Sequence, residues 1–438
     1  MRMTSVNKKS GIKCVENIPI EWKNTKIKYV SELDPIKSEL QYNNFYGKEV
    51  TFLPMEKLKS GFLILDSERI FEEVFEGYNY FADGDILFAK VTPSFENGNI
   101  GIASNLVNGL GFGSSEIYVL RANKIDKLFL YYFIQNDEFK SESVSNMYGV
   151  AGLKRVPSGF IRNYEFALPT FQEQRAIADF LDKKTAQIDK AHDLLTRQIE
   201  TLKNYRKSLI YEAVTKGLDT KVKLKPSGVD WIGDVPCGWE VSKLKYLTVG
   251  KLQYGANAEG VDFSENLPRY IRITDISQDN NLKIDGKQSL PLEISAPYIL
   301  NDGDILFARS GATVGKTFLY TEECGKAAFA GYLIRANFDK NKVISKFIYY
   351  TTLGQGYENW KNSIFSQSTI QNIGADKYSE LWIAIPNYME QQGITSFLDK
   401  KTSKVDEIIQ NKQQQIQNLD KQRKTLIYDY VTGKKRVK

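Results

Sequence analysis

The fold is decided by two related stretches, TFQEQRAIADFLDKKTAQIDKAHDLLTRQIETLKNYRKSLIYEAVTKG (residues 170–217) and NYMEQQGITSFLDKKTSKVDEIIQNKQQQIQNLDKQRKTLIYDYVTG (residues 387–433). An apolar residue recurs at every seventh position of the first: Leu181, Ile188, Leu195, Leu202 and Leu209. The corresponding positions of the second, 217 residues later, are Leu398, Val405, Lys412, Leu419 and Leu426. This period predicts two long helices whose apolar seams form a coiled coil. Because such a helix has no core of its own, we expect each to pack against its duplicate.

Both stretches carry signals for the start and the end of a helix. Thr170 followed by Glu173, and Asn387 followed by Glu390, fit a capping box, in which each side chain pairs with an amide at the helix start. Gly217 and Gly433 stand near the far ends, where a left-handed residue often terminates a helix. At about 1.5 Å per residue, each helix is expected to span roughly 65 Å.

Length and composition indicate a globular protein. The 438 residues allow roughly two to four domains, and 42% hydrophobic residues suffice for packed cores. We expect a cytoplasmic chain, because it has neither an apolar run of about 18 residues nor a secretory signal at its start. Three cysteines without CxxC spacing support neither a disulfide framework nor a zinc site, and a net charge of +6 modestly favours polyanionic partners.

The rest of the chain is also duplicated. The segment IPIEWKNTKIKYV (18–30) returns as VPCGWEVSKLKYL (235–247), and FADGDILFAK (81–90) returns as LNDGDILFAR (300–309). In both, DGDILFA predicts a turn that leads into a buried strand. We therefore predict an α+β protein with a pseudo-twofold repeat of two mainly-β domains. The first domain comprises residues 1–169, and its helix comprises residues 170–217. The linker and the second domain comprise residues 218–386, and the second helix comprises residues 387–438.

Catalytic and metal chemistry finds no support in the residue patterns. Residues 311–317 (GATVGKT) resemble a phosphate-binding P-loop, but three residues instead of four separate the glycines and no helix is expected to follow. The single histidine, His192, falls on the coiled-coil seam. We therefore predict a non-catalytic chain without a metal site.

The candidate functional residues lie in polar loops at equivalent places in the two copies. Arg, Lys, Asn, Gln, Ser and Thr side chains pair with base edges and phosphates, so these loops are candidate DNA contacts. After the DGDILFA strands the candidates are Lys90, Thr92, Ser94, Asn97 and Asn99 in the first copy and Arg309, Ser310, Thr313 and Lys316 in the second. Ahead of the long helices they are Lys154 and Arg155 in the first copy and Gln367 and Ser368 in the second.

Taken together, the KPSGVDWIGDVPCGW opening of the second copy, the DGDILFA strands and the FLDKKT helices resemble the specificity subunits of type I restriction-modification systems. The resemblance covers nearly the whole chain. It implies two target-recognition domains that each read one half of a split DNA site, held apart by two antiparallel helices. In that family the specificity subunit has no catalytic activity.

The resemblance also implies partners and their cofactors. Besides double-stranded DNA, we expect two modification subunits that use S-adenosylmethionine and, in a complete enzyme, two restriction subunits that use ATP and Mg²⁺. The apolar seam residues would hold the helical spacer on which partners dock. A membrane partner is not expected.

The two copies differ at their candidate contacts, which predicts two unlike half-sites. One difference is Glu116, which matches a recurrent glutamate of the family; aligning EIYVLRA (116–122) with GYLIRA (331–336) predicts that Gly331 replaces it. A coiled-coil scaffold that joins two protein-binding domains without touching DNA remains the main alternative, and a basic face on each domain would argue against it.

Overall fold

The computed structural model describes residues 7–12, 15–150, 152–277, 280–365 and 372–437. The chain divides into two compact units: unit 1 comprises Met1–Leu195 and Gln414–Lys438, and unit 2 comprises Thr196–Gln413. Each unit therefore contains a globular domain and one end of each long helix.

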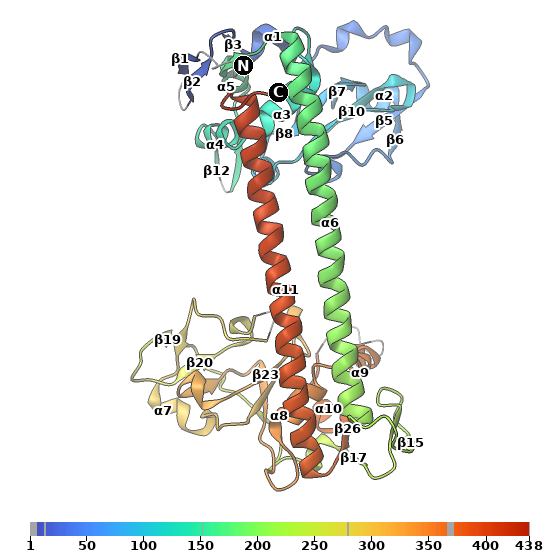
Figure 1. The fold of residues 1–438 in the computed structure, drawn as a ribbon, viewed down its shortest axis with the longest axis vertical. Helices are drawn as coiled ribbons and strands as arrows, with labels where there is room; N and C mark the ends of the chain where they lie inside the picture. Colours follow the sequence, from blue (N-terminus) through green and yellow to red (C-terminus); the bar gives the residue numbers. More distant parts are fainter. Residues whose placement is uncertain (1–6, 13–14, 151, 278–279, 366–371, 438) are drawn as a thin grey trace, which may run out of the picture. The chain divides into compact units, whose positions relative to one another are not determined.

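Unit 1 is built on two four-stranded sheets (Figure 1). One has the strand order β4-β11-β8-β9: Ser31–Leu33, Ile117–Ala122, Ile86–Ala89 and Ile100–Ile102. The other has the order β6-β5-β10-β7: Glu68–Ile70, Glu49–Leu53, Leu110–Gly113 and Asn79–Ala82. Three strand pairs complete the unit: β1 (Asn7–Ile12) with β2 (Val15–Pro19), β12 (Tyr148–Val150) with β13 (Leu153–Arg155), and β14 (Glu165–Leu168) with β3 (Lys23–Lys26).

Short helices connect these strands and close the core of unit 1. They are α1 (Ile27–Val30), α2 (Phe71–Phe75), α3 (Lys127–Gln135), α4 (Asp137–Ser145) and α5 (Ser158–Asn163). The main hydrophobic core joins sheet residues such as Leu87 and Val119 to Leu181 and Ile427 of the long helices. The globular domain and its helix ends thus share one core.

Unit 2 repeats the first of these sheets. The order β18-β25-β22-β23 corresponds to β4-β11-β8-β9, with strands Gln253–Tyr254, Leu333–Ala336, Ile305–Ala308 and Thr317–Leu319. The second sheet is β19-β21-β20-β24: Val261–Asp262, Gln288–Ser289, Arg269–Ile271 and Ala327–Phe329. The remaining elements are β15 (Leu224–Pro226) with β16 (Asp234–Pro236), β17 (Glu240–Lys243) with β26 (Trp382–Ile385), and helices α7 (Leu292–Ser295), α8 (Ser345–Thr351), α9 (Gln355–Phe365) and α10 (Ala375–Ser379).

The DGDILFA segments form turns and buried strands, as predicted. All four residues of β8 and of β22 are buried. The second aspartate closes each turn, because Asp85 accepts a hydrogen bond from the Ala82 amide and Asp304 accepts one from the Asn301 amide, both at 2.8 Å. Gly84 and Gly303 have φ of +94° and +90°, a conformation that favours glycine.

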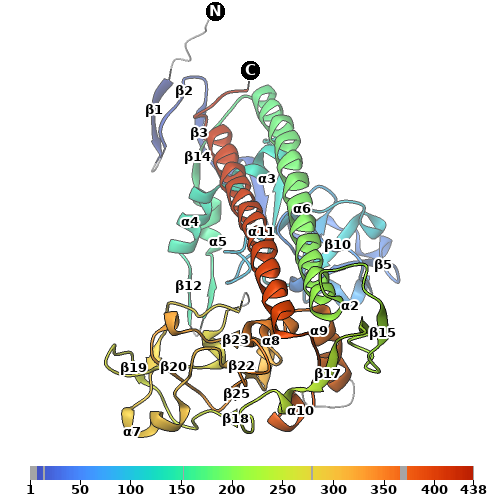
Figure 2. The same ribbon diagram turned by 60° about the horizontal axis from the view of Figure 1, so that its bottom comes forward.

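Two long helices, α6 (Phe171–Lys216) and α11 (Tyr388–Val431), run without a break (Figure 2). In unit 1, Asp189 of α6 pairs with Arg423 of α11 at 3.3 Å, and the rings of Phe180 and Tyr430 lie 4.5 Å apart. Since the residue number rises along α6 while it falls along α11, the helices are antiparallel there, as expected.

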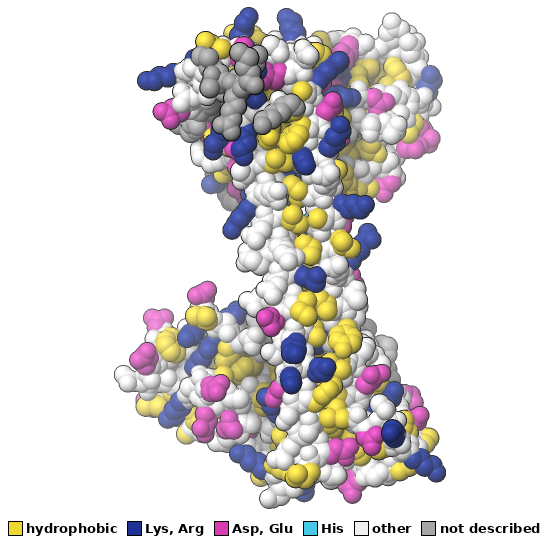
Figure 3. All heavy atoms as spheres, in the orientation of Figure 1, with side chains coloured by type: hydrophobic (Ala, Val, Ile, Leu, Met, Phe, Trp, Pro, Cys, Tyr) yellow, Lys and Arg dark blue, Asp and Glu magenta, His cyan; other side chains and the backbone are white. Residues whose placement is uncertain are grey.

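The same direction holds in unit 2. Lys412 donates a hydrogen bond to Gln198 at 2.6 Å, and Arg206 pairs with Asp406 at 2.9 Å. Lys412, which interrupts the apolar repeat, thus has a polar partner on the facing helix. Figure 3 shows hydrophobic side chains following the long helices.

The predicted seam residues are buried to different extents along the helices. Leu181, Ile188, Leu398 and Val405 are buried. Leu195, Leu202, Leu209, Leu419 and Leu426 are half-buried. Leu181 and Leu398 belong to the cores of the globular domains, whereas Leu195 and Leu202 belong to neither domain core, so the middle of the seam is covered chiefly by the facing helix.

The predicted capping boxes are half correct. Thr170 Oγ1 accepts a hydrogen bond from the Glu173 amide at 3.4 Å, and Asn387 Oδ1 accepts one from the Glu390 amide at 3.0 Å. The reciprocal half is wrong, because the glutamate side chains bind tryptophans instead: Trp22 Nε1 donates to Glu173 and Trp239 Nε1 donates to Glu390, both at 3.0 Å. A buried indole N–H needs an acceptor, and these carboxylates supply it.

The FLDKKT repeat anchors each globular domain to its long helix. The Tyr132 hydroxyl on α3 lies 3.0 Å from Thr185 Oγ1 and 3.3 Å from Asp182. The Tyr350 hydroxyl on α8 likewise lies 2.6 Å from Asp399 and 3.4 Å from Thr402. The aspartate and threonine of the motif therefore have the same role in both units.

Candidate nucleic-acid interface

In unit 1, two candidate loops that are distant in the sequence lie side by side. The loop after β8 meets the hairpin β12–β13: the Thr92 amide donates to the Lys154 carbonyl at 3.0 Å, and Thr92 Oγ1 donates to the Gly152 carbonyl at 2.8 Å. Thr92 Oγ1 also accepts a hydrogen bond from the Lys154 amide at 3.0 Å. The loop and the hairpin therefore form one surface.

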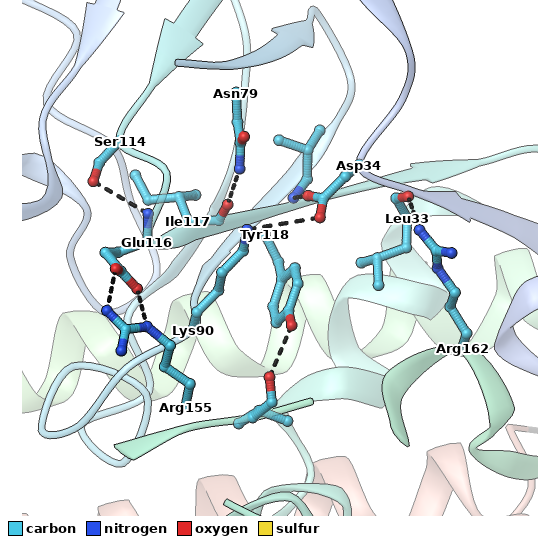
Figure 4. A network of polar contacts seen from close by, with 12 residues as sticks. Leu33, Asp34, Asn79, Lys90, Ser114, Glu116, Ile117, Tyr118, Arg155 and Arg162 are labelled. Carbon is cyan, nitrogen blue, oxygen red and sulfur yellow. Dashed lines mark hydrogen bonds and ion pairs between the residues drawn. The ribbon is translucent and has the colours of Figure 1, made fainter. Parts of the chain in front are cut away.

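Lys90, the first residue of this loop, is enclosed beneath that surface. Its Nζ lies 3.7 Å from Asp34 Oδ2 and 4.4 Å from the centre of the Tyr118 ring, and its side chain is 16% exposed (Figure 4). Burial lowers the pKa of Lys90, and the Asp34 carboxylate partly offsets that effect. Lys90 thus already has an anionic partner within the protein.

Arg155 of the hairpin is held by Glu116 (Figure 4). Its Nε donates to Glu116 Oε2 at 2.9 Å, and its Nη2 donates to Oε1, which makes a two-pronged ion pair. These hydrogen bonds lower the pKa of the Glu116 carboxyl. The Arg155 side chain remains 42% exposed, so part of its guanidinium faces solvent.

The other candidates of unit 1 are more open to solvent. Asn97 and Lys154 are exposed, and Ser94, Thr92 and Asn99 are half-buried. The loop is stabilised from within, because the Asn97 amide donates to the Pro93 carbonyl and the Asn99 amide donates to the Ser94 carbonyl. Its side chains are thus presented on an ordered backbone.

In unit 2, the loop after β22 has a similar neighbour. The Arg309 amide donates to the Tyr332 carbonyl at 3.1 Å, and the Ile373 amide donates to the Arg309 carbonyl at 2.8 Å. Ser310 forms a β-bridge with Asn372. Gln367 and Ser368, the other candidates here, lie outside the described residues.

The P-loop resemblance in this segment does not extend to the fold. Gly311–Thr313 forms a 3-10 turn, and strand β23 follows Lys316. Lys316 donates to the Ser277 carbonyl at 3.2 Å, and Ser310, Thr313 and Lys316 are all half-buried. The helix that would bind a phosphate at its start is replaced by a strand.

A cavity of about 1030 Å³ opens beside Arg309 in unit 2. Its lining includes Arg309, Ser310, Asn372, Tyr254, Tyr332, Asn257, Glu259, Arg272 and Gln288. The guanidinium of Arg309 lies over the Tyr254 ring, 5.0 Å from its centre. Tyr332 is 63% exposed. The sequence patterns did not predict Tyr254 or Tyr332 as contacts, although each stands beside a glycine, Gly255 or Gly331.

Strand register corrects one prediction about this site. Ile117 pairs with Ala89 in unit 1 and Leu333 pairs with Ala308 in unit 2, so the residue that corresponds to Glu116 is Tyr332 and not Gly331. The backbone hydrogen bonds agree with this register. The Lys90 amide donates to the Glu116 carbonyl, and the Arg309 amide donates to the Tyr332 carbonyl. The alignment that matched the first residues of the two segments, Glu116 and Gly331, was therefore wrong by one residue.

No cluster of three or more His, Cys, Asp or Glu side chains able to hold a metal occurs in the described part of the chain. The helices within the same ranges include none long and apolar enough to span a membrane.

Comparison with known proteins identifies similar chains. The family model described as type I restriction modification DNA specificity domain matches twice, at residues 19–203 and 238–418. The EcoAI specificity subunit of Escherichia coli is 35% identical over 167 residues, which are 36% of this chain and 27% of that subunit. This chain thus matches about a quarter of that relative's length.

Longer matches have lower identity. The MjaVIII specificity subunit of Methanocaldococcus jannaschii is 23% identical over 332 residues, 74% of each chain. Among solved structures, a chain from a study of complex assembly and conformational transition of the type I R-M system superposes with a TM-score of 0.71. That chain is 16% identical, and the superposition covers 95% of this chain and 99% of the other, which shows the same fold.

Proposed function

The chain belongs to the family of type I restriction modification DNA specificity domains, and we propose that it is the sequence-recognition subunit of a type I restriction-modification complex. The observation that carries this proposal is the twofold match of the family model, with one match for each globular domain and its following helix. Each domain would recognise one half of a split DNA site.

The paired loops support this assignment. In unit 1 the loop after β8 and the hairpin β12–β13 form one surface, and in unit 2 the loop after β22 lies beside a cavity. These are equivalent places in a sheet of the same strand order, but their side chains differ. The proposal therefore includes an asymmetric target with two unlike half-sites.

The long helices would act as a spacer between the readers. With 46 residues, α6 is about 69 Å long at 1.5 Å per residue. That length corresponds to roughly 20 base pairs at about 3.4 Å each, or just under two turns of duplex. We expect the helices to dock two modification subunits, and restriction subunits in a cleaving complex.

In this proposal the chemistry belongs to those partners. The modification subunits would bind S-adenosylmethionine, and the restriction subunits would bind ATP and Mg²⁺. This chain would supply binding and geometry, with Asn97, Lys154 and Arg155 as contacts of unit 1 and Arg309 and Ser310 as contacts of unit 2.

Methylation mapping tests the proposal. DNA from cells that express this chain with its modification subunit is compared with DNA from cells that lack only this chain. We expect a split, asymmetric motif to be methylated only when the chain is present. A modification subunit that is active without any chain-dependent motif would contradict the proposal and would favour a scaffold role.

A further inference from the structure

Arg309 is a cation that forms no ion pair with a carboxylate among the described residues. Its guanidinium stacks over Tyr254, and its Nε is buried without a hydrogen-bond partner among the described residues. A buried donor that stays unpaired destabilises the protein, so such groups usually have a partner in the functional state. The Arg309 side chain also lines the cavity of unit 2.

The equivalent position in unit 1 shows what unit 2 lacks. Lys90 has the carboxylate of Asp34 nearby, and Glu116 pairs with Arg155. Strand pairing places Gln253 opposite Arg335 where unit 1 has Asp34 opposite Val119. As Tyr332 also replaces Glu116, both carboxylates near the cation of unit 1 are replaced by uncharged side chains in unit 2.

The other charged groups of the cavity narrow the choice of ligand. Arg272 is neutralised by Asp275, with Nη2–Oδ1 at 2.9 Å and Nε–Oδ2 at 3.1 Å. Glu259 is exposed and lines the same cavity, so its carboxylate repels an entering phosphate. The remaining lining includes the amides of Asn257, Asn372 and Gln288, groups that pair with base edges.

From this geometry we infer that Arg309 recognises a guanine in the half-site bound by unit 2. The planar guanidinium of arginine presents two N–H groups in one plane, which match the O6 and N7 acceptors of guanine. Tyr254 supports the guanidinium from one side, with 5.0 Å between the guanidinium carbon and the ring centre, and the cavity provides room for the base edge. The inference rests on the proposed function and adds the base and the residue that reads it.

The test uses the complex of the full chain with its modification subunits. Methylation is mapped for the unchanged chain and for Arg309→Gln and Arg309→Lys. We expect both variants to lose discrimination at one guanine position of one half-site by about 10-fold, with the other half-site unchanged, because glutamine lacks the charge and lysine lacks the planar fork of N–H donors. Lys225→Gln, an exposed charge change in β15 away from the cavity, is the matched control and should leave the motif unchanged.

A binding measurement then tests whether Arg309 contacts the N7 atom of that guanine. Duplexes that carry 7-deazaguanine at that position lack the N7 acceptor, and their affinity for the unchanged complex should fall roughly 10-fold. The Arg309→Gln complex should bind both duplexes equally. Equal sensitivity of the two complexes to the deaza base would overturn the inference.

Other results of the methylation mapping would also decide between a guanine contact and its alternatives. A uniform loss of methylation that Arg309→Lys restores would show a phosphate contact in place of a guanine contact. A change at an A·T pair, or at both half-sites, would likewise overturn the inference while leaving the proposed function intact. If even the unchanged chain directs no motif, the proposed function fails and the guanine assignment fails with it.

Discussion

At the scale of single residues, a shared hydrogen bond explains why both copies of the repeat contain a tryptophan at this position. Trp22 and Trp239 are buried, and each donates its indole N–H to the glutamate in the first turn of a long helix. The partners are separated by 151 residues in both units. Each contact ties the start of a globular domain to the helix that follows it.

The two contacts differ in one respect that allows a test. Glu173 also accepts a hydrogen bond from Arg436 at 3.0 Å, so it keeps a cationic partner when the indole is lost. We expect Trp239→Phe to destabilise unit 2 by about 1–3 kcal/mol, and Trp22→Phe to destabilise unit 1 by less. Both changes remove the same ring volume and the same hydrogen bond, so the difference between them reports the contribution of Arg436.

Hydrogen exchange in the first turns of α6 and α11, together with urea unfolding, measures the two effects. A larger loss for Trp22→Phe, or equal losses, would contradict the account based on Arg436.

At the scale of elements, two ion pairs join the helices of the coiled coil. Arg423 pairs with Asp189 in unit 1, and Arg206 pairs with Asp406 in unit 2. Arg206 and Arg423 occupy equivalent positions, as do Asp189 and Asp406, so each helix contributes one residue of each charge. An antiparallel arrangement is what brings unlike charges together in both pairs.

Because the spacer is helical, its length is expected to control the gap between half-sites. Insertion of one heptad near Leu195 and another near Lys412 adds about 10.5 Å to each helix, or roughly three base pairs of duplex. We expect methylation mapping to show a longer gap and unchanged half-site sequences.

A heptad inserted in α6 alone is the control, since it disrupts the interhelical register without lengthening a matched pair. An unchanged gap in the doubly extended chain would contradict the spacer model.

At the scale of the whole molecule, the C-terminal segment closes unit 1. Arg436 binds Glu173 and lies 3.5 Å from Glu21, and Val437 packs against the main core of that unit. Lys435 pairs with Asp429, which is almost fully buried, at 2.8 Å. Unit 1 is thus assembled from segments close to both ends of the sequence.

Deletion of residues 434–438 should therefore destabilise unit 1 and spare unit 2. The deletion leaves the buried Asp429 carboxylate without Lys434 and Lys435 and removes Arg436 from Glu173, so we expect a loss of stability in unit 1. Hydrogen exchange should become faster in β3, β14 and the first turn of α6, and should not change in β17 and β26. Equal changes in both units would show that residues 434–438 affect the stability of the whole chain and would contradict this prediction.

Much of the fold follows from local pattern. The heptads of α6 and α11 and the apolar run of DGDILFA predicted helices and buried strands correctly, because periodicity and burial are properties of a short stretch. Strand register was less accessible. Gly331 and Tyr332 are neighbours in the chain, and only the pairing of Leu333 with Ala308 shows which of them corresponds to Glu116.

In the candidate site, too, some features follow from local sequence and others depend on tertiary packing. The sequence by itself determined the duplication, the two long helices and the loops after β8 and β22. Only the tertiary structure decided that Lys90 is enclosed by Asp34 and Tyr118, that the hairpin β12–β13 joins the loop at Thr92, and that Arg309 faces a cavity. The physical reason is that these partners lie tens of residues apart in the chain, and only packing brings a charge to its acceptor or leaves it without one.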